Sequence, residues 1–315
     1  MLELSASDVR RIVSTRDALA AAAEAFKFAS SREVLDLPRF AVGEKNLLVM
    51  TAGHNSLPGI LVKVLSLQFG SDRLARTSLS GTVAWFDTES GEITAVMDAA
   101  VITSLRTGAA SALATERLTT VNATVLAMIG AGGQAADQVR SVCLVCPITE
   151  VRIASLHAPS RERLAGELAS QFPDVHFVAC KTVRAAVHGA DVICTATPSE
   201  RPLFDLSDIG TRVHINAIGS YRPEMCEIDP AILNAATMVV VDREDSVRSG
   251  SGEIVRASKL SELELVELGA LLNGDVPTSE SSGITVFKSV GVAAQDWCLA
   301  RMIVDRAKDE AWSQC

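Results

Sequence analysis

The sequence predicts an α/β protein that combines a doubly wound parallel sheet with a second, α+β unit. Three observations lead to this class. From residue 123 onward, apolar strands alternate with amphipathic helices; a glycine-rich turn joins the first of these strands to its helix; and before residue 119, several strand-like segments follow one another directly. Alternating strands and helices imply a parallel sheet covered by helices.

The first part of the chain is predicted to mix helices and strands. Residues 7–29 have helical spacing after a Ser/Asp start, and a second, long helix is expected over 98–118. Strands rich in Val, Leu and Ile are expected at 46–51, 59–69, 82–87 and 92–97, the last two joined through the turn 88–91.

The second part is predicted to form the parallel sheet. Its expected strands are 124–129, 151–156, 175–178, 191–196, 212–218 and 237–241, and its expected helices are 133–145, 160–171 and 181–188. A last helix over 290–311 is expected to return to the first unit. The predicted domains are therefore 1–118 with 290–315, and 119–289. Ligands of such sheets bind at the carboxyl ends of the strands.

Composition narrows the class of partner. The 315 residues are 48% hydrophobic and 21% charged, which allows a sizeable core, and the net charge of −9 argues against nucleic acid or an anionic membrane. No apolar run is long enough to span a bilayer, and the polar start has no secretory signal. The seven scattered cysteines suit reduced thiols in a cytoplasmic protein. Cys143 and Cys146 form a CxxC in an apolar stretch without a second pair, so we expect buried thiols and no metal.

The glycine-rich turn at 129–135 reads IGAGGQA and has the context of a dinucleotide-binding fingerprint. It follows a predicted strand, opens a predicted helix and starts a run of βα units. Gly130 permits the tight turn, Gly132 lets a pyrophosphate approach the backbone, and Ala135 lets the helix pack close to the strand. Backbone N–H groups and the helix dipole would hold the phosphates. The alternative is a glycine-rich connection with no ligand. The turn predicts a Rossmann-type domain.

The end of the second strand of this sheet bears on the choice of cofactor. An acid there would hold the ribose 2′-hydroxyl of NAD, but no acid sits at the strand end. Instead it carries Ser155, His157, Ser160, Arg161 and Arg163. Hydroxyls and cations favour a 2′-phosphate, so we expect NADPH, with NADH as the alternative. The two arginines could instead form a solvated helix face.

Several separated motifs together resemble the ornithine cyclodeaminase/mu-crystallin family over nearly the whole chain. They are LPRF at 37–40, GILVKVLSL at 59–67, GTVAWFDTESGEITAVMDAAVITSLRTGAASALA at 81–114, IGAGGQA at 129–135, DVICTATPS at 191–199, NAIGSYRPEMCEID at 216–229 and VFKSVGVAAQDW at 286–297. The resemblance implies a homodimer, with a dimerisation and substrate domain beside a Rossmann domain. It also implies an oxidoreductase that handles imino or amino acids with a nicotinamide cofactor.

The resemblance also implies roles for individual residues. Arg39, Lys63 and Arg106 would face the substrate carboxylate, while Gly133 and Gln134 would hold the cofactor phosphates. The implied positions around the nicotinamide end are Thr197, Ala217, Ile218, Gly219, Ser289 and Val290. Thr195 and Ala196 are also expected to bind the cofactor. Cations in apolar or small-residue settings need an anion, and an α-carboxylate offers one that arginine can bind bidentately. A structural salt bridge is the alternative for each cation.

One motif departs from the cyclodeaminase pattern. Where that pattern, GGDxPGK, carries Asp and Lys, this chain reads GSYRPEM, with Tyr221 and Met225. A phenol with a pKa near 10 cannot readily take a proton from an ammonium at neutral pH. Cyclisation of ornithine is therefore disfavoured. The motif looks like that of the branch that reduces cyclic ketimines, such as Δ1-pyrroline-2-carboxylate to L-proline or Δ1-piperideine-2-carboxylate to L-pipecolate.

The expected reaction is imine reduction, in which the protein orients the two reactants. Lys63, His54 and Tyr221 are the candidate proton donors; the alternatives are a turn histidine for His54 and wall packing for Tyr221. Asp296 is expected to cap or pair locally, with a site role as the alternative. The rival functions are ornithine cyclodeaminase, an alanine dehydrogenase-like amino-acid dehydrogenase, and a mu-crystallin-like binding protein without turnover.

Overall fold

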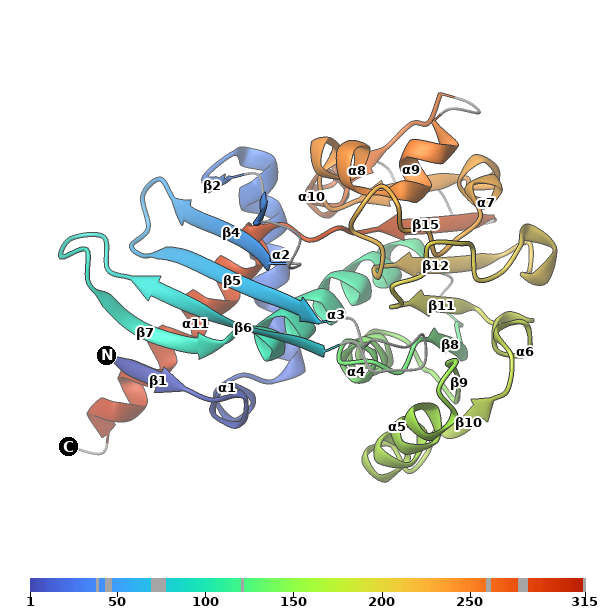
Figure 1. Cartoon of the computed structure of the whole chain (residues 1–315), viewed down its shortest axis with the longest axis horizontal. Coiled ribbons are helices and arrows are strands. Elements are labelled where there is room, and N and C mark those ends of the chain that lie inside the picture. The colour runs from blue at the N-terminus through green and yellow to red at the C-terminus, as the bar shows by residue number, and fades with distance from the viewer. Residues whose placement is uncertain are drawn as a thin grey trace. The chain divides into compact units, whose positions relative to one another are not determined.

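The computed structural model describes residues 1–37, 40–42, 47–68, 78–119, 122–258, 262–276 and 283–313. The chain divides into two compact units (Figure 1). Unit 1 comprises Met1–Ala110 with Val292–Cys315, and unit 2 comprises Ser111–Gly291. The predicted borders lay at residues 118 and 290. The observed first border falls earlier because helix α3 (Ala99–Leu118) begins in unit 1 and ends in unit 2.

Unit 1 is built on a seven-stranded sheet with the order β1-β7-β6-β5-β4-β2, in which β3 also pairs with β4. Its strands are β1 (Leu2–Leu4), β2 (Val34–Asp36), β3 (Phe40–Val42), β4 (Leu47–His54), β5 (Ile60–Gln68), β6 (Ser78–Phe86) and β7 (Ile93–Asp98). The pairs are antiparallel except β1 with β7. Period-2 alternation in β5 turns Leu61, Lys63 and Leu65 to the buried face and leaves Ile60 and Val64 exposed.

Helices at both ends of the chain complete unit 1: α1 (Ala6–Ile12), α2 (Thr15–Ser31) and α11 (Ala293–Ser313). The prediction of one helix over 7–29 is wrong, because the chain forms two. Ser14 caps the start of α2 by accepting the backbone N–H of Asp17, in a capping box. Arg301 of α11 pairs with Glu24 of α2, and Arg306 pairs with Asp17. These contacts tie the last helix to the first segment of the chain.

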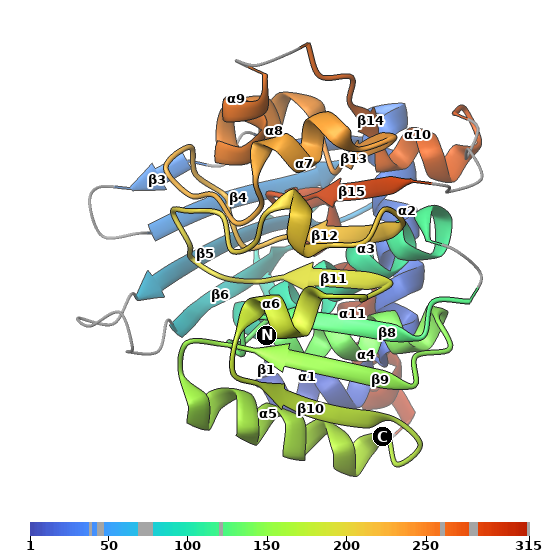
Figure 2. The ribbon, with the colours of Figure 1, turned by 90° about the vertical axis from the view of Figure 1, so that its right-hand side faces the viewer.

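Unit 2 contains an eight-stranded, entirely parallel sheet with the order β10-β9-β8-β11-β12-β15-β13-β14. Figure 2 shows these strands side by side. The strands are β8 (Val125–Ile129), β9 (Glu150–Ala154), β10 (His176–Cys180), β11 (Val192–Thr195), β12 (Val213–Ala217), β13 (Met238–Val241), β14 (Val266–Glu267) and β15 (Ile284–Lys288). The helices are α4 (Ala135–Val145), α5 (Ala158–Gln171), α6 (Val183–Val187), α7 (Pro230–Ala235), α8 (Glu244–Gly250), α9 (Gly252–Ala257) and α10 (Leu268–Asn273), with the 3-10 turn η2 (Leu206–Asp208).

Two apolar clusters cover the two faces of this sheet. Ala127 and Ile129 of β8 belong to a core that includes residues of α6, α7 and α9. Leu126 and Met128, which alternate with them, belong to a core that includes residues of α4 and α5. The predicted fold class, a doubly wound parallel sheet with an α+β unit, is therefore confirmed. β15 was not predicted; it lies between β12 and β13 and brings Lys288 to the carboxyl edge of the sheet.

No helix within the described part of the chain is long and apolar enough to cross a membrane.

Candidate functional site

Three charged side chains from distant segments meet inside unit 1. Lys63 of β5 donates from Nζ to Oδ2 of Asp296 at 2.5 Å, and Nε of Arg106 lies 3.3 Å from Oδ1 of the same carboxylate. Lys63 and Asp296 are fully buried, and Arg106 is 6% exposed. The expectation that Asp296 pairs locally is wrong, because both of its partners lie far from it along the chain.

The first turn of α11 supplies the acidic side of this cluster. Asp296 and Gln295 are adjacent on it, and Oε1 of Gln295 accepts from Nη1 of Arg106 at 3.0 Å. Nε2 of Gln295 is buried and has no hydrogen-bond partner among the described residues. Nζ of Lys63 also lies 3.5 Å from the hydroxyl of Thr103 on α3. Three elements therefore position two cations around one carboxylate.

Burial dominates the electrostatics of Lys63. The pKa of its ammonium is lowered from 10.5 to about 8, chiefly by loss of solvent; the Asp296 carboxylate opposes this shift and the Arg106 charge adds to it. A lysine with this pKa exchanges protons close to neutrality, as a general acid requires.

The other residues predicted for the substrate region differ in what the structure shows. Arg39 lies outside the described residues. His54, at the end of β4, accepts the backbone N–H groups of Ser56 and Leu57 on Nδ1, each at 3.0 Å. Its ring stacks on Trp297 with centroids 5.6 Å apart. This is the geometry of the turn histidine that was the alternative for His54.

The glycine-rich turn of unit 2 has open space where a ligand would bind. Gly130 has a φ of 108°, and a β-carbon there would come within 2.5 Å of the Ala196 carbonyl oxygen. A β-carbon at Gly132 or Gly133 would meet no described atom within 4 Å. The turn then enters α4 through Gln134, whose Oε1 is buried without a hydrogen-bond partner in the described structure. These features fit a dinucleotide pyrophosphate held by backbone N–H groups.

The residues predicted to select the cofactor cluster after β9. Nη1 of Arg161 donates to the Ser155 carbonyl at 2.9 Å, and His157 Nδ1 lies 2.8 Å from the Ser160 hydroxyl. Arg163 is exposed on α5. The Ser160 hydroxyl, the His157 ring and the Arg161 guanidinium thus lie at the start of α5.

The loops after β11 and β12 approach each other at the carboxyl edge of the sheet, and both are bound to Glu227. The Glu227 carboxylate accepts from the backbone N–H groups of Thr197, Gly219 and Ser220 at 2.6, 2.6 and 3.2 Å, and from the Thr197 hydroxyl at 2.8 Å. A β-carbon at Gly219 would lie 2.3 Å from the Thr197 nitrogen, so only glycine allows this approach. Thr195, which ends β11, keeps a buried hydroxyl with no hydrogen-bond partner in the described structure.

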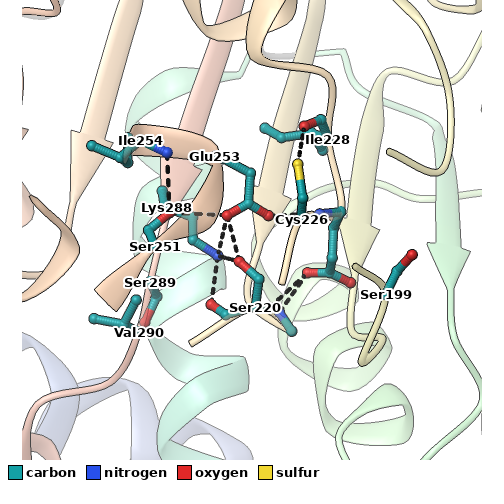
Figure 3. Close-up of polar contacts among 12 residues, drawn as sticks. Ser199, Ser220, Cys226, Ile228, Ser251, Glu253, Ile254, Lys288, Ser289 and Val290 are labelled. Atoms are coloured by element: carbon teal, nitrogen blue, oxygen red, sulfur yellow. Dashed lines mark hydrogen bonds and ion pairs between the residues drawn. The ribbon is translucent and has the colours of Figure 1, made fainter. Parts of the chain in front are cut away.

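A second buried carboxylate, from α9, lies behind Glu227. Glu253 accepts the Glu227 N–H at 2.7 Å and the Ser220 hydroxyl at 2.5 Å. Figure 3 shows Lys288 reaching from β15 to the same group: its Nζ donates to the Ser220 carbonyl at 2.8 Å and the Ser220 hydroxyl at 2.6 Å, and lies 3.6 Å from Glu253. All four side chains are fully buried.

A third carboxylate holds the loop after β15. Asp242 accepts the Ser289 hydroxyl and the N–H groups of Val290 and Gly291, at 2.8, 2.8 and 2.6 Å. The segments 195–197, 217–219 and 289–290 therefore end neighbouring strands at one edge of the sheet, as the position of the predicted nicotinamide end requires.

Tyr221 is partly buried. Its ring packs against the apolar core of unit 2, and the Arg222 guanidinium lies 5.2 Å from the ring centroid. These contacts favour the packing role over proton transfer.

Sequence reasoning missed the carboxylates that organise these regions. Asp296 was considered only as a weak candidate, and Glu227, Glu253, Asp242 and Lys288 were not singled out. The signal available for Lys288 and Asp242 was position, because each comes at the end of an apolar strand. For Glu253 the sequence offers no comparable signal.

Comparisons with known proteins cover nearly the whole chain. The model of the ornithine cyclodeaminase/mu-crystallin family matches residues 2–311. A Δ1-pyrroline-2-carboxylate reductase from Bacillus cereus is 30% identical over 317 residues, covering 98% of this chain and 97% of the relative. The ketimine reductase mu-crystallin of Mus musculus is 33% identical over 257 residues, covering 82% and 79%.

Solved structures show the same fold. The Δ1-pyrroline-2-carboxylate reductase of Thermococcus litoralis, in complex with NADH and L-proline, has a TM-score of 0.92 at 26% identity, covering 99% of this chain and 98% of that one. An archaeal alanine dehydrogenase dimer with bound NAD has a TM-score of 0.88 at 27% identity, covering 99% and 97%. The chain belongs to the ornithine cyclodeaminase/mu-crystallin family.

Proposed function

We propose that this protein is an oxidoreductase that uses a nicotinamide dinucleotide to reduce a cyclic ketimine bearing a carboxylate. Δ1-Pyrroline-2-carboxylate is the first candidate substrate and Δ1-piperideine-2-carboxylate the second. The observation that carries the proposal is the buried cluster of Lys63, Arg106 and Asp296, in a chain whose relatives are named as reductases of such imines.

The cluster has the donors that an α-carboxylate needs. Of the five N–H donors of Arg106, one donates to Gln295, while Nε forms an ion pair with Asp296 without a hydrogen bond. The rest of the guanidinium fork suits a bidentate carboxylate contact. Asp296 already neutralises part of the positive charge of Lys63 and Arg106. We therefore propose that Arg39 is a third cation that binds the substrate carboxylate, and we call these three cations the clamp.

Lys63 is the proposed proton donor. Its lowered pKa lets it give up a proton near neutrality, whereas Nδ1 of His54 is engaged by two backbone N–H groups. Asp296 would hold the ammonium toward the substrate nitrogen. The bound cofactor would supply the hydride, and the protein would orient and protonate the imine.

The cofactor would lie along the carboxyl edge of the unit 2 sheet. The proposed phosphate site is the turn Gly130–Ala135, and the nicotinamide end is the set of loops after β11, β12 and β15. Solved structures of relatives hold NADH or NAD. For this chain we propose NADPH, because the end of β9 carries Ser155, His157 and Arg161 in place of an acid; NADH is the alternative.

A homodimer is the proposed assembly. The unit 1 sheet exposes large apolar side chains on β5 and β7, the strands on either side of β6: Ile60 is 44% exposed, Val64 40% and Ile93 41%. Exposed apolar side chains on one sheet suit contact with a second copy of the chain. The six described cysteines form no disulfide, in keeping with the proposed cytoplasmic location.

An absorbance assay at the nicotinamide band tests the proposal. NADPH and NADH are each offered with pyrroline-2-carboxylate, with piperideine-2-carboxylate, and with pyruvate plus ammonia. Ornithine is offered separately with the oxidised cofactors, and ammonia release is followed. The expected result is that only a cyclic imine oxidises the reduced cofactor.

Turnover of pyruvate plus ammonia instead would identify an alanine dehydrogenase, which the likeness to the archaeal alanine dehydrogenase makes the second candidate. Tight binding of the imine without turnover would identify a binding protein.

A further inference from the structure

The buried carboxylate of Glu227 holds two loops at the carboxyl edge of the unit 2 sheet. Its oxygens accept three backbone N–H groups and one hydroxyl from the loops after β11 and β12. Backbone N–H groups can only donate, so this arrangement matches an ionised carboxylate. Removal of the Glu227 side chain would leave these three backbone donors without their partner.

The charges around Glu227 do not balance. Glu253 accepts from the Glu227 backbone and from the hydroxyls of Ser220 and Ser251. Burial raises the pKa of Glu253, but the Lys288 ammonium and the hydrogen bonds from the Ser220 hydroxyl and the Glu227 backbone outweigh it, so the pKa is lowered. Two carboxylates therefore face one ammonium, which leaves a net charge of about −1 in a region closed to solvent.

Of the two buried carboxylates, Glu227 is the one whose negative charge is less fully compensated. Burial raises the pKa of its carboxyl group, and the Glu253 charge adds to that effect against the Lys288 ammonium. An under-compensated buried carboxylate gains free energy from any cation that comes close. The two loops that it binds are the ones to which we assign the nicotinamide end, and the nicotinamide ring is cationic only when oxidised.

We propose that Glu227 is the positioning residue of the nicotinamide end and that its charge, backed by Glu253, makes the protein favour the oxidised cofactor over the reduced one. This inference rests on the proposed function, since it requires a nicotinamide dinucleotide at this edge. It goes further by assigning a role to Glu227, which binds the loops through hydrogen bonds. These hydrogen bonds hold the loops in place, and the net negative charge favours the oxidised form of the cofactor.

Affinities for the oxidised and reduced forms of the same cofactor, measured by calorimetry, test this without any turnover. Glu227→Gln keeps the size of the side chain and removes the charge. We expect the ratio of Kd for the oxidised form to Kd for the reduced form to rise about tenfold, which for two electrons corresponds to about 30 mV in the potential of the bound cofactor. Glu227→Asp keeps the charge and loses reach, so both forms should bind more weakly with the ratio unchanged within about twofold.

Two further variants keep the test decisive. Glu253→Gln should raise the ratio in the same direction, and it replaces Glu227→Gln if that variant does not fold. Asp191→Asn is the matched control: Asp191 also accepts two backbone N–H groups, of Thr124 and Val125, but precedes β11 at the opposite end of the strand. It should leave the ratio unchanged.

Equal weakening of both forms by Glu227→Gln would overturn the inference and reduce Glu227 to a structural role. Failure of the unaltered protein to bind either form would instead overturn the proposed function.

Discussion

Replacing Asp296 by Asn tests the central cluster of unit 1. The substitution removes the carboxylate that faces Lys63 at 2.5 Å and Arg106 at 3.3 Å, while keeping nearly the same shape. At an effective dielectric constant of about 20, a unit-charge pair at 3.3 Å contributes about 5 kcal/mol of attraction. Desolvation offsets part of this, and loss of one partner of a buried pair typically costs about 3–5 kcal/mol. We expect a cost of that size in the free energy of unfolding at pH 7.

The two cations should share this cost unequally. Lys63 can lose its proton, and with a pKa of about 8 that costs only about 1 kcal/mol at pH 7. A guanidinium keeps its charge in proteins, so most of the cost falls on the arginine. At pH 9 Lys63 is already largely neutral in the unaltered protein. The destabilisation by Asp296→Asn should therefore be smaller at pH 9 by about 1 kcal/mol.

Tryptophan fluorescence during urea unfolding measures this cost selectively. The three tryptophans, Trp85, Trp297 and Trp312, all belong to unit 1, so the signal reports that unit. Combining the variant with Arg106→Met should recover much of the loss, because the stranded cation is then absent. A cost below about 1 kcal/mol at both pH values, or no recovery in the double variant, would refute the reasoning.

The remaining predictions concern activity, cofactor choice and assembly. Arg106→Ala should lower kcat/KM for the ketimine at least about a hundredfold, and a change below threefold would remove Arg106 from the clamp. If protonated Lys63 is the donor, kcat/KM should fall about tenfold per pH unit above about pH 8, and Lys63→Arg should abolish that limb; a flat profile to pH 10 would exclude the role. Replacing Arg161 and Arg163 by Ala should weaken NADPH far more than NADH in calorimetry, whereas equal losses would contradict the 2′-phosphate assignment. Val64→Lys should shift the protein toward monomer in light scattering, and an unchanged mass would argue against the exposed sheet face as the interface.

Much of the fold could be predicted from hydrophobic periodicity and from the residues of the turns. The alternation after residue 123 and the glycine turn are local patterns, so strands β8 to β13 and helices α4 to α6 lie within a few residues of their expected ranges. β15 was missed because a run of five residues, ITVFK, has no period of its own to separate it from a buried helix segment. The sequence does mark the break between α1 and α2, because Ser5 and Ser14 are each followed three residues later by Asp, the pattern of a capping box at a helix start.

The sequence could not predict the parts of the site that depend on contacts between residues far apart in the chain. The burial of Lys63 follows from its place in an alternating strand, but its partner Asp296 lies 233 positions away and no local pattern links the two. Glu227 is one acid among many in the sequence. Only the fold shows that it accepts from two different loops.

The discontinuous make-up of unit 1 has a consequence for biosynthesis. Its sheet is translated within the first third of the chain, yet Asp296 and Trp297 leave the ribosome only after all of unit 2. Until then the β5 lysine and its arginine neighbour lack their counterion, and the indole that donates to the Gly59 carbonyl is absent. A nascent chain would thus complete unit 2, which is contiguous in sequence, before unit 1 could finish folding. This reverses the usual order, in which the amino-terminal domain folds first.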